Sequence, residues 1–481
     1  MKSKPQTVAL PAYDRKTLTP GIVHIGLGNF HRAHMAVYLD DLFALGQDHD
    51  WAILGAGVRD GDARMRDALM AQDCLSTVIE LDPKGRSARR IGSMIDFLPV
   101  TPDNADLIAA MTRPEIRIVS LTVTEGGYFI DPATGQFNPT DPEIVADAAN
   151  PHRTAFGAII AALRARRANG TPPFTVMSCD NLPGNGHVTK AAVTGLARLS
   201  DPALASWIAA NVAFPNGMVD RITPATGPRE RAMATAFGLT DPVPVTCEPF
   251  RQWVLEDTFP SGRPALETVG VTFTAQVHAY ESMKIRILNG GHAAIAYPGG
   301  LMGIEYVHEA MAHPLIRGFL DRLETEEIIP YVPPVPETNT STYYATIRER
   351  FSNPEIADTE RRLCLDGSNR QPKFIIPSLR DALAAGGPIE GLALVSALWC
   401  RYCYGTTDAG VQIEANDPNW DHLQAQSKAA RDNPVIWLQM RPIYGDLNRN
   451  PRFVTAFTKA LNALWEQGTA KTLNAYIRHP L

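Results

Sequence analysis

The first half of the chain alternates strand-like and helix-like segments, and this alternation constrains the fold more than any other feature of the sequence. Four short apolar runs typical of buried strands occupy residues 21–26, 51–58, 115–123 and 174–179. Segments with apolar residues at helical spacing lie between them, at residues 30–45, 65–70 and 155–167. Repeated strand–helix–strand units form a mostly parallel sheet with helices on both faces. We therefore predict an α/β fold with a Rossmann-type dinucleotide-binding domain in the N-terminal half.

The second half is dominated by helix-like segments. They lie at residues 281–288, 315–326, 340–351, 378–385, 392–404 and 452–467. Proline-rich joints such as residues 330–336 separate them. The change of pattern near residue 280 predicts two domains. We expect a Rossmann-type domain at residues 1–279, a mainly α-helical substrate domain at residues 280–481, and an active site in the cleft between them.

Charge and composition argue against several classes of protein. The 481 residues include 45 Lys and Arg against 51 Asp and Glu, a net charge of -6, whereas a nucleic-acid surface requires a basic patch. No stretch approaches the ~20 apolar residues of a membrane span. The six cysteines are scattered and no export signal is recognisable, so we expect reduced thiols and a cytoplasmic protein. Cys400 and Cys403 form one Cys-x-x-Cys pair, but without a second Cys or His pair at zinc spacing we expect no metal.

A glycine-rich turn follows the first predicted strand. Gly26 and Gly28, with Asn29 and Phe30 after them, close that strand and open the next helix. In a dinucleotide fold such glycines allow a tight turn and let a pyrophosphate approach backbone N–H groups at a helix N-terminus. His31 stands where the usual GxGxxG pattern has its third glycine. The motif therefore indicates a dinucleotide mainly through its context of strand, turn, helix and second strand.

Two acidic residues after the second predicted strand, Asp60 and Asp62, favour NAD as the cofactor. Glu125, after the third strand, is a further predicted cofactor-binding residue. A carboxylate near the adenosine ribose accepts hydrogen bonds from its hydroxyls and repels the 2′-phosphate of NADP. Arg59 lies beside them and could serve that phosphate, so NADP is less favoured but stays open.

The densest group of polar residues lies at residues 280–292. If this segment is an α-helix, four polar side chains fall within one arc of roughly 140°: Glu281, Lys284, Asn289 and His292. A lysine can act as a general base where burial lowers its pKa, and an amide can hold a developing alkoxide without adding charge. Asn181, at the carboxyl end of the fourth predicted strand, is placed to join them. These groups suit proton removal from an alcohol whose hydride goes to a nicotinamide; the alternative is a solvated face that ends in an Asn-Gly turn.

Six motifs occur in order along almost the whole chain. They are GIVHIGLGNFHRAH (21–34), LTVTEGGY (121–128), CDNLPGNG (179–186), FPNGMVDRITP (214–224), EPFRQWVLED (248–257) and KIRILNGGH (284–292). Together they resemble the polyol-specific long-chain dehydrogenases, the mannitol dehydrogenase family, and within it the bacterial mannitol 2-dehydrogenases. The resemblance implies NAD-dependent oxidation of a sugar alcohol, D-mannitol to D-fructose, by a metal-independent enzyme that is typically a monomer.

The resemblance also implies roles for individual residues. Lys284 would be the general base, Asn181 and Asn289 would hold the reacting oxygen, and His292 would orient substrate hydroxyls. Further substrate or proton contacts would come from Asp220, Glu281, and Arg362 or Lys373. Asn29 replaces the family's glycine, at a turn position that we expect to be able to adopt the left-handed conformation.

Other functions stay open from the sequence alone. D-arabinitol or D-sorbitol oxidation would use the same groups, and reduction of a hexuronate such as fructuronate would add a cationic clamp from Arg362 or Lys373. A regulator that binds NADH without catalysis is disfavoured because no basic recognition helix is recognisable. A zinc alcohol dehydrogenase is suggested by His31, His34 and the Cys-x-x-Cys pair, but their spacing is poor for a metal.

Overall fold

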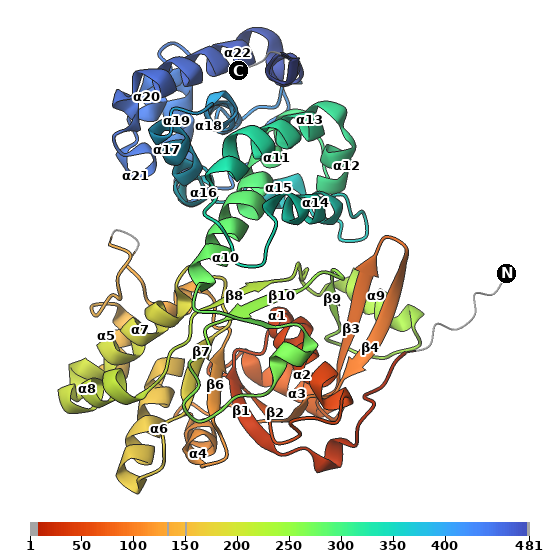
Figure 1. Ribbon diagram of the computed structural model, residues 1–481, viewed down its shortest axis with the longest axis vertical. Helices are drawn as coiled ribbons and strands as arrows, with labels where there is room; N and C mark the ends of the chain where they lie inside the picture. Colours follow the sequence, from red (N-terminus) through yellow and green to blue (C-terminus); the bar gives the residue numbers. More distant parts are fainter. Residues whose placement is uncertain (1–7, 132–133, 150–151, 479–481) are drawn as a thin grey trace, which may run out of the picture. The chain divides into compact units, whose positions relative to one another are not determined.

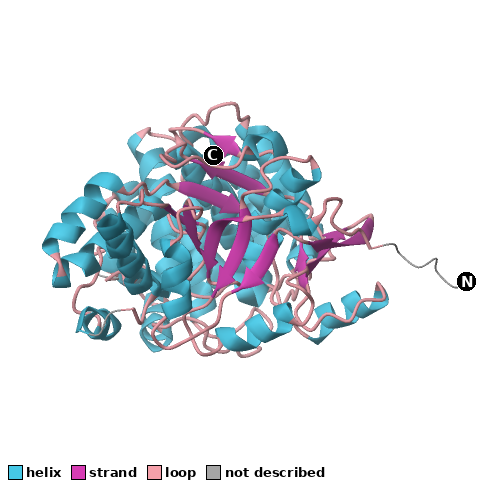
Figure 2. Ribbon diagram, turned by 90° about the horizontal axis from the view of Figure 1, so that it is seen from below, coloured by secondary structure: helices cyan, strands magenta, loops and turns pink. Residues whose placement is uncertain are grey.

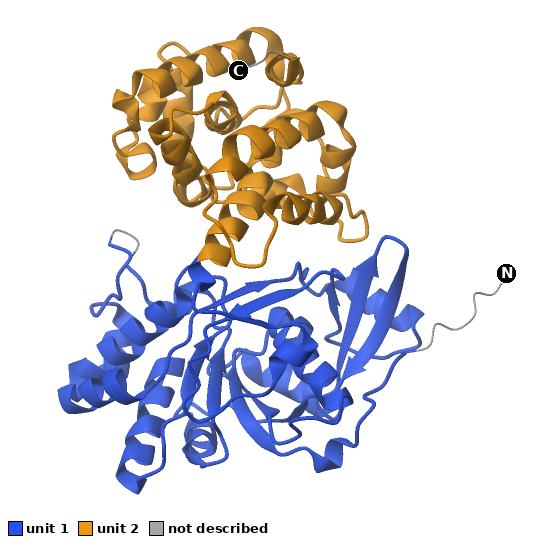
Figure 3. Cartoon of the chain, viewed as in Figure 1, with its two compact units in different colours: residues 1–278 blue, residues 279–481 orange. Residues whose placement is uncertain are grey.

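The protein consists of two compact units. In the computed structural model, which describes residues 8–131, 134–149 and 152–478, they comprise residues 1–278 and 279–481 (Figure 3). All named strands in the described ranges lie before residue 274, in unit 1. Figure 2 shows these strands in magenta.

A five-stranded parallel sheet forms the centre of unit 1 (Figure 1). In spatial order its strands are β5 (Met94–Phe97), β2 (Ala52–Ala56), β1 (Pro20–Ile25), β6 (Ile118–Leu121) and β7 (Thr175–Ser178). The central strand β1 pairs with β2 on one side and β6 on the other, so that His24 lies opposite both Gly55 and Ser120. The strand order reverses there, and ligands of such sheets bind at the carboxyl ends of the strands beside this switch point.

Alternate residues of the central strands face two separate hydrophobic cores. Ile22 and Ile118 lie in one cluster with α2 (Met35–Ala44), whereas Val23 and Val119 lie in the other with α6 (Ala155–Asn169). The predicted Rossmann-type sheet with helices on both faces is therefore confirmed. The other helices of unit 1 are η1 (Arg15–Thr17), α1 (Asn29–Ala33), α3 (Asp62–Met70), α4 (Ala105–Thr112), η2 (Glu125–Tyr128), α5 (Pro142–Ala149), α7 (Asn185–Ser200), α8 (Pro202–Asn211), α9 (Pro228–Ala236) and η3 (Leu266–Val269).

Two three-stranded sheets extend unit 1. One contains β11 (Thr272–Phe273), β10 (Gln252–Leu255) and β8 (Gly217–Asp220); the other contains β4 (Gly85–Ile91), β3 (Ser76–Asp82) and β9 (Val245–Cys247). β8 and β10 are antiparallel, with Asp220 opposite Gln252. This pairing fixes the end of β8, where a substrate-binding carboxylate is predicted.

Unit 2 is mainly helical, as predicted. Its elements are α10 (Val277–Met283), whose first two residues belong to unit 1, η4 (Lys284–Asn289), α11 (Gly290–Leu301), α12 (Val307–Ala312), α13 (Pro314–Leu323), η5 (Glu324–Ile328), η6 (Ile329–Tyr331), α14 (Thr340–Phe351), α15 (Glu360–Leu363), α16 (Gly367–Phe374), α17 (Ile376–Ala384), α18 (Glu390–Cys403), α19 (Trp420–Ala430), α20 (Val435–Leu438), α21 (Arg441–Tyr444), η7 (Leu447–Arg449) and α22 (Pro451–Arg478). Two of them, η4 and η5, are π-helices. Within the described ranges, no helix has both the length and the apolar character needed to span a bilayer.

The single helix predicted at residues 30–45 is wrong. The chain breaks between α1 and α2 at His34, whose φ of -123° and ψ of -90° are not helical. The His34 imidazole is fully buried and its Nε2 lies 2.9 Å from the carbonyl oxygen of Gln252 in β10. A contact to a strand more than 200 residues away thus overrides the local helical pattern.

Candidate active site

The first glycine of the turn is required by close packing between β1 and β6. Gly26 has a φ of +95°, and a Cβ atom there would lie 2.2 Å from the carbonyl oxygen of Thr122. Its N–H donates to Ala56 O at 3.0 Å, and its carbonyl accepts from Thr122 Oγ1 at 2.5 Å. Only glycine fits this position, and the turn is thereby fixed at the switch point of the sheet.

The second glycine leaves open space above the backbone. Gly28 is exposed at the N-cap of α1, and a Cβ atom there would meet nothing within 4 Å. A phosphate group could therefore approach the N–H groups that begin α1, as it does in dinucleotide-binding folds. The residues present fit an NAD-type cofactor at this end of the sheet.

The expectation that Asn29 takes a left-handed turn conformation is wrong. Asn29 is the first residue of α1, and its side chain is held by protein groups. Its Nδ2 donates to Pro224 O at 3.1 Å and to Thr226 Oγ1 at 2.9 Å, while its Oδ1 accepts from the Arg32 guanidinium at 2.8 Å. The side chain of Asn29 thus ties the turn to a distant segment. Phe30, the next residue, stacks on the His34 ring with 4.8 Å between the ring centroids.

The two candidate ribose carboxylates have different surroundings. Asp62 Oδ2 accepts hydrogen bonds from the N–H groups of Val58 and Arg59, each at 3.0 Å, and so fastens the turn after β2. Asp60 is exposed at the tip of this turn. Asp60 is therefore the carboxylate better placed to meet a ligand, whereas Asp62 holds the turn in shape.

Three histidines lie buried beneath the glycine turn. His24 and His31 stack with their ring centroids 3.5 Å apart, and burial lowers the pKa of His24 to about 3 and that of His31 well below its usual range. Burial likewise lowers the pKa of His34 to about 3. His31, at the position of the missing third glycine, packs in the core as a neutral ring. In the described ranges, no three His, Cys, Asp or Glu side chains come together as metal ligands.

A buried carboxyl that the sequence analysis missed shapes the loops after β6 and β7. Asp180 accepts hydrogen bonds from the N–H groups of Val123 and Thr124, at 2.9 and 3.0 Å, and from Tyr128 Oη at 2.6 Å. These bonds bring two predicted site residues, Glu125 and Asn181, to the same edge of the sheet, and both are exposed there. The sequence shows Asp180 only as the middle residue of a Cys-Asp-Asn motif. Its structural role becomes evident from its hydrogen bonds in the folded protein.

In unit 2, the predicted catalytic segment is a π-helix. Lys284 is its first residue and Asn289 its last. A π-helix bonds each N–H to the carbonyl five residues earlier, as Gly290 N–H does to Ile285 O, and π-helices are frequent at functional sites. Lys284 and Glu281 are buried, each 6% exposed. The helix continues through Gly290 and Gly291 into α11, so the alternative of an Asn-Gly turn is wrong.

The end of this segment is packed against α13, η5 and α14. The His292 ring stacks on Phe351 with centroids 4.1 Å apart and an interplanar angle of 15°. Gly291 leaves room for Glu324, since a Cβ atom would lie 3.2 Å from Glu324 Oε1. Glu324 is fully buried, and burial raises its pKa well above the usual range. The burial of Glu324 is not predictable from the sequence, because the acidic run at residues 324–327 is typical of a solvated helix face.

The two candidate cations for a substrate carboxylate lie in different settings. Arg362 forms a bidentate ion pair with Asp358 four residues before it, and this pairing raises the pKa of the guanidinium. Its side chain is still 52% exposed. Lys373 is exposed on α16. Arg362 is therefore already neutralised, whereas Lys373 is the more accessible cation.

These features define the class of protein. Unit 1 is a Rossmann-type fold with a dinucleotide turn, and unit 2 presents a buried lysine and an amide on one helical segment. Two family models match: the mannitol dehydrogenase Rossmann domain over residues 20–268 and the mannitol dehydrogenase C-terminal domain over residues 276–465. The chain belongs to the mannitol dehydrogenase family and is an oxidoreductase, which confirms the resemblance.

Individual relatives agree with this assignment. A mannitol 2-dehydrogenase of Cereibacter sphaeroides is 69% identical over 98% of this chain and 99% of its own, and one of Aspergillus oryzae is 44% identical over 98% and 96%. The structure of Pseudomonas fluorescens mannitol 2-dehydrogenase in a ternary complex with NAD and D-mannitol has a TM-score of 0.85 and 44% identity, and covers 98% of this chain and 97% of that one. A substrate-free D-sorbitol dehydrogenase has a TM-score of 0.90 and 35% identity, with 98% of each chain covered.

Proposed function

We propose that the protein is an NAD-dependent, metal-independent polyol dehydrogenase that oxidises D-mannitol to D-fructose. The observation that carries the proposal is the buried Lys284 one π-helical turn from Asn289, in a chain that is 69% identical to a mannitol 2-dehydrogenase. The similar Pseudomonas enzyme binds NAD and D-mannitol in its ternary complex.

In the proposed mechanism Lys284 takes the proton of a secondary hydroxyl group. A base must be unprotonated to act, and burial favours the neutral form of an amine. Asn181 and Asn289 donate to the oxygen as it becomes a carbonyl, which stabilises developing charge without adding a competing base. NAD, when bound, supplies the hydride acceptor. The hydride leaves the carbon that bore the hydroxyl, so the alcohol loses one proton and one hydride and becomes a ketone.

Other residues would hold the substrate and its proton path. His292, kept in place by Phe351, and Asp220, fixed at the end of β8, orient the remaining hydroxyls. Glu281, three residues before the base, passes its proton toward solvent.

The cofactor would bind along the carboxyl edge of the parallel sheet. The backbone of Gly26 and Gly28 would face the pyrophosphate, with Asn29 and Phe30 at the start of α1. The carboxylates of Asp60 and Asp62 would face the adenosine ribose. Glu125 would border the nicotinamide end. We also propose that the enzyme works in the cytoplasm as a monomer, which light scattering after size exclusion would test.

D-Sorbitol is the second candidate substrate, because a solved D-sorbitol dehydrogenase is similar over 98% of the chain. A hexuronate would require a free cation for its carboxylate. Lys373 could supply this contact more readily than Arg362, which is paired with Asp358.

The test is an NADH-absorbance assay of the purified protein. D-mannitol, D-arabinitol and D-sorbitol are offered with NAD⁺ and then NADP⁺, and fructose and fructuronate with the reduced cofactors. We expect the highest kcat/KM for D-mannitol with NAD⁺, unchanged after chelator treatment. A rate only with fructuronate, or none on the panel, would contradict the proposal.

A further inference from the structure

Helix α1, which begins directly after Gly28, is fastened at its first residue to a segment far along the chain. Asn29 Nδ2 donates to Pro224 O and to Thr226 Oγ1, at 3.1 and 2.9 Å. Thr226 Oγ1 in turn donates to Pro244 O at 2.7 Å. The hydroxyl of Thr226 therefore joins the start of α1 to Pro244, directly before β9.

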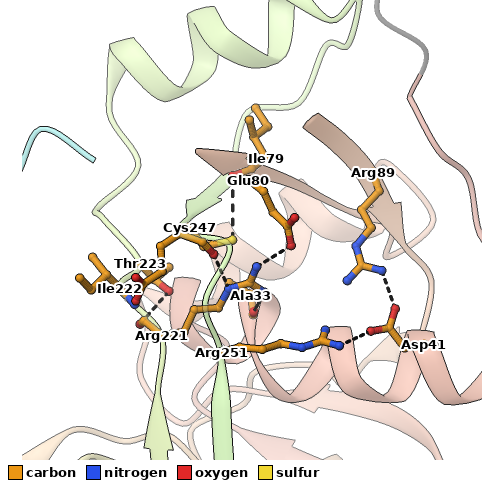
Figure 4. A network of polar contacts seen from close by, with 11 residues as sticks. Ala33, Asp41, Ile79, Glu80, Arg89, Arg221, Ile222, Thr223, Cys247 and Arg251 are labelled. Atoms are coloured by element: carbon orange, nitrogen blue, oxygen red, sulfur yellow. Dashed lines mark hydrogen bonds and ion pairs between the residues drawn. The ribbon is translucent and has the colours of Figure 1, made fainter. Parts of the chain in front are cut away.

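The last residue of α1 is fastened to the same segment by Arg221. Its guanidinium donates to Ala33 O at 2.6 Å, to Glu248 O at 2.9 Å and to Glu80 Oε1 at 2.6 Å (Figure 4). The Arg221 side chain is fully buried. Ala33 O is one of the terminal helix carbonyls that lack a partner within the helix, so Arg221 both caps α1 and anchors it.

The start and the end of α1 thus have two anchors, the contact between Asn29 and Thr226 and the contacts of Arg221. Further hydrogen bonds hold the residues around these anchors. Ile222 N–H donates to Glu248 Oε1 at 2.5 Å, and Glu248 N–H donates to Ile222 O at 3.0 Å. On the next helix, Asp41 accepts from Arg89 and Arg251, at 2.5 and 2.6 Å (Figure 4). Burying a guanidinium is costly unless its donors are well paired. Three acceptors converge on Arg221, so this arrangement is specific for arginine.

The segment so anchored, residues 220–226, begins with Asp220. We infer that the contacts of Asn29, Thr226 and Arg221 position Asp220 relative to the cofactor turn, and so set where the polyol lies against the bound dinucleotide. This inference rests on the proposed function. These three are positioning residues for polyol binding, acting through Asp220 on one side and α1 on the other.

Because of these anchors, we expect substitutions in residues 220–226 to change the binding of D-mannitol and of NAD⁺ unequally. Apart from the contacts of Asn29, the cofactor turn is held at Gly26 by contacts to Thr122 and Ala56, which do not involve residues 220–226. Loosening residues 220–226 should therefore weaken the polyol contact more than the dinucleotide contact. A merely structural role would lower thermal stability and leave the ratio of the two KM values unchanged.

The experiment compares Thr226→Val with Thr223→Val in the full chain. Both replace a half-buried hydroxyl by a methyl group of similar size in one segment, but Thr223 Oγ1 donates to Arg221 O, within the segment, at 3.4 Å. KM for D-mannitol, KM for NAD⁺, kcat, the Kd of NADH and the thermal midpoint are measured for each. Thr226→Val removes two hydrogen bonds, one from Asn29 and one to Pro244. We expect KM for D-mannitol to rise about fivefold, which corresponds to about 1 kcal/mol. KM for NAD⁺ and the Kd of NADH should change less than about twofold, and Thr223→Val should leave the KM ratio unchanged.

A second variant tests the other anchor. Arg221→Lys keeps the charge but cannot reach three acceptors at once, so the KM for D-mannitol should rise at least as much as in Thr226→Val. An unchanged KM ratio in folded Thr226→Val would overturn the inference and leave the proposed function standing. A wild-type protein that oxidises no polyol would overturn both. If Arg221→Lys does not fold, Thr226→Val alone decides.

Discussion

Lys284 and Asn289 are the first and last residues of one π-helical turn, so their side chains project from the same face of unit 2. In an α-helix residues five apart are turned by about 140° from each other. The π-helix thus brings together a candidate base and a candidate oxygen-binding amide that an α-helix would separate. Arg286, between them, points to other partners, with hydrogen bonds or ion pairs to Tyr331 O at 2.9 Å and Asp381 Oδ2 at 2.6 Å.

Lys284→Ala removes the proposed general base. General-base catalysis contributes roughly 10²- to 10⁴-fold, so kcat for D-mannitol should fall by that factor. The Kd of NADH, measured by fluorescence titration, should change less than about twofold. Lys428→Ala, at an exposed lysine of α19, is the control and should keep full activity. Retained turnover in Lys284→Ala would end the proposal for this residue.

Asp60→Ser tests the preference for NAD. Because Asp60 is the exposed carboxylate, its removal should relieve repulsion of the 2′-phosphate and raise kcat/KM for NADP⁺ at least about tenfold, equivalent to roughly 1.4 kcal/mol. Asp62→Asn should instead weaken both cofactors alike, since Asp62 Oδ2 holds the N–H groups of Val58 and Arg59. Equal changes for NAD⁺ and NADP⁺ in Asp60→Ser would contradict the assignment of Asp60.

Gly291→Ala tests the close packing of Glu324 against α11. The added methyl group would lie 3.2 Å from Glu324 Oε1 and 3.4 Å from Phe351 Cε2. Overpacking costs about 1–3 kcal/mol, and alanine regains about 1 kcal/mol of helix propensity. We therefore expect a net loss of up to about 2 kcal/mol in urea unfolding, with a raised KM for D-mannitol because Phe351 also holds His292.

The control for this change is Gly61→Ala. Gly61 has a φ of -63°, and a Cβ atom there would meet nothing within 4 Å. Alanine should therefore stabilise the protein by about 0.4–1 kcal/mol through the unfolded state. Stabilisation of Gly291→Ala, as expected for Gly61→Ala, would show that packing at Gly291 is looser than the structure indicates.

Glu327 makes stability depend on pH. Burial raises its pKa from 4.5 to about 7, although the N–H groups of Gly391 and Leu392 and the hydroxyl of Tyr476 donate to its carboxylate. The folded state holds this proton more tightly, so the contribution of Glu327 is full below about pH 4.5 and falls as pH rises to about 7. The raised pKa of Glu327 corresponds to on the order of 3 kcal/mol.

The measurement for Glu327 is urea unfolding of the wild type and Glu327→Gln at several pH values between about 5 and 8. Other carboxyl groups cancel in the difference between the two proteins. The side-chain amide in Glu327→Gln has a single acceptor oxygen, so one of the N–H groups of Gly391 and Leu392 loses its acceptor. The wild type should therefore be the more stable protein at pH 5. Its advantage should shrink as pH rises, and a constant difference would contradict the raised pKa of Glu327.

The sequence by itself determines the order of elements and the class of fold. Periodicity is a local property, so the apolar runs that became β1, β2, β6 and β7 can be recognised without knowing their neighbours. The same holds for the GxG turn, because its glycines are close together in the sequence, although the contact that requires glycine at position 26 comes from Thr122. The ordered motifs likewise identify the family, since each is a short string of adjacent residues.

Only the tertiary structure decides what each polar side chain contacts. From the sequence alone, Asn29 is predicted to be a turn residue. In the structure its side chain donates to Pro224 and Thr226, nearly 200 positions away. The helix is interrupted at His34, whose ring lies against a carbonyl in β10. Glu324 belongs to an acidic run in the sequence, but it packs against Gly291. These contacts join segments that the chain separates widely, and burial then sets the charge of the groups involved. Local sequence contains the propensity of each residue, whereas its partners and its pKa depend on the packing of the whole unit.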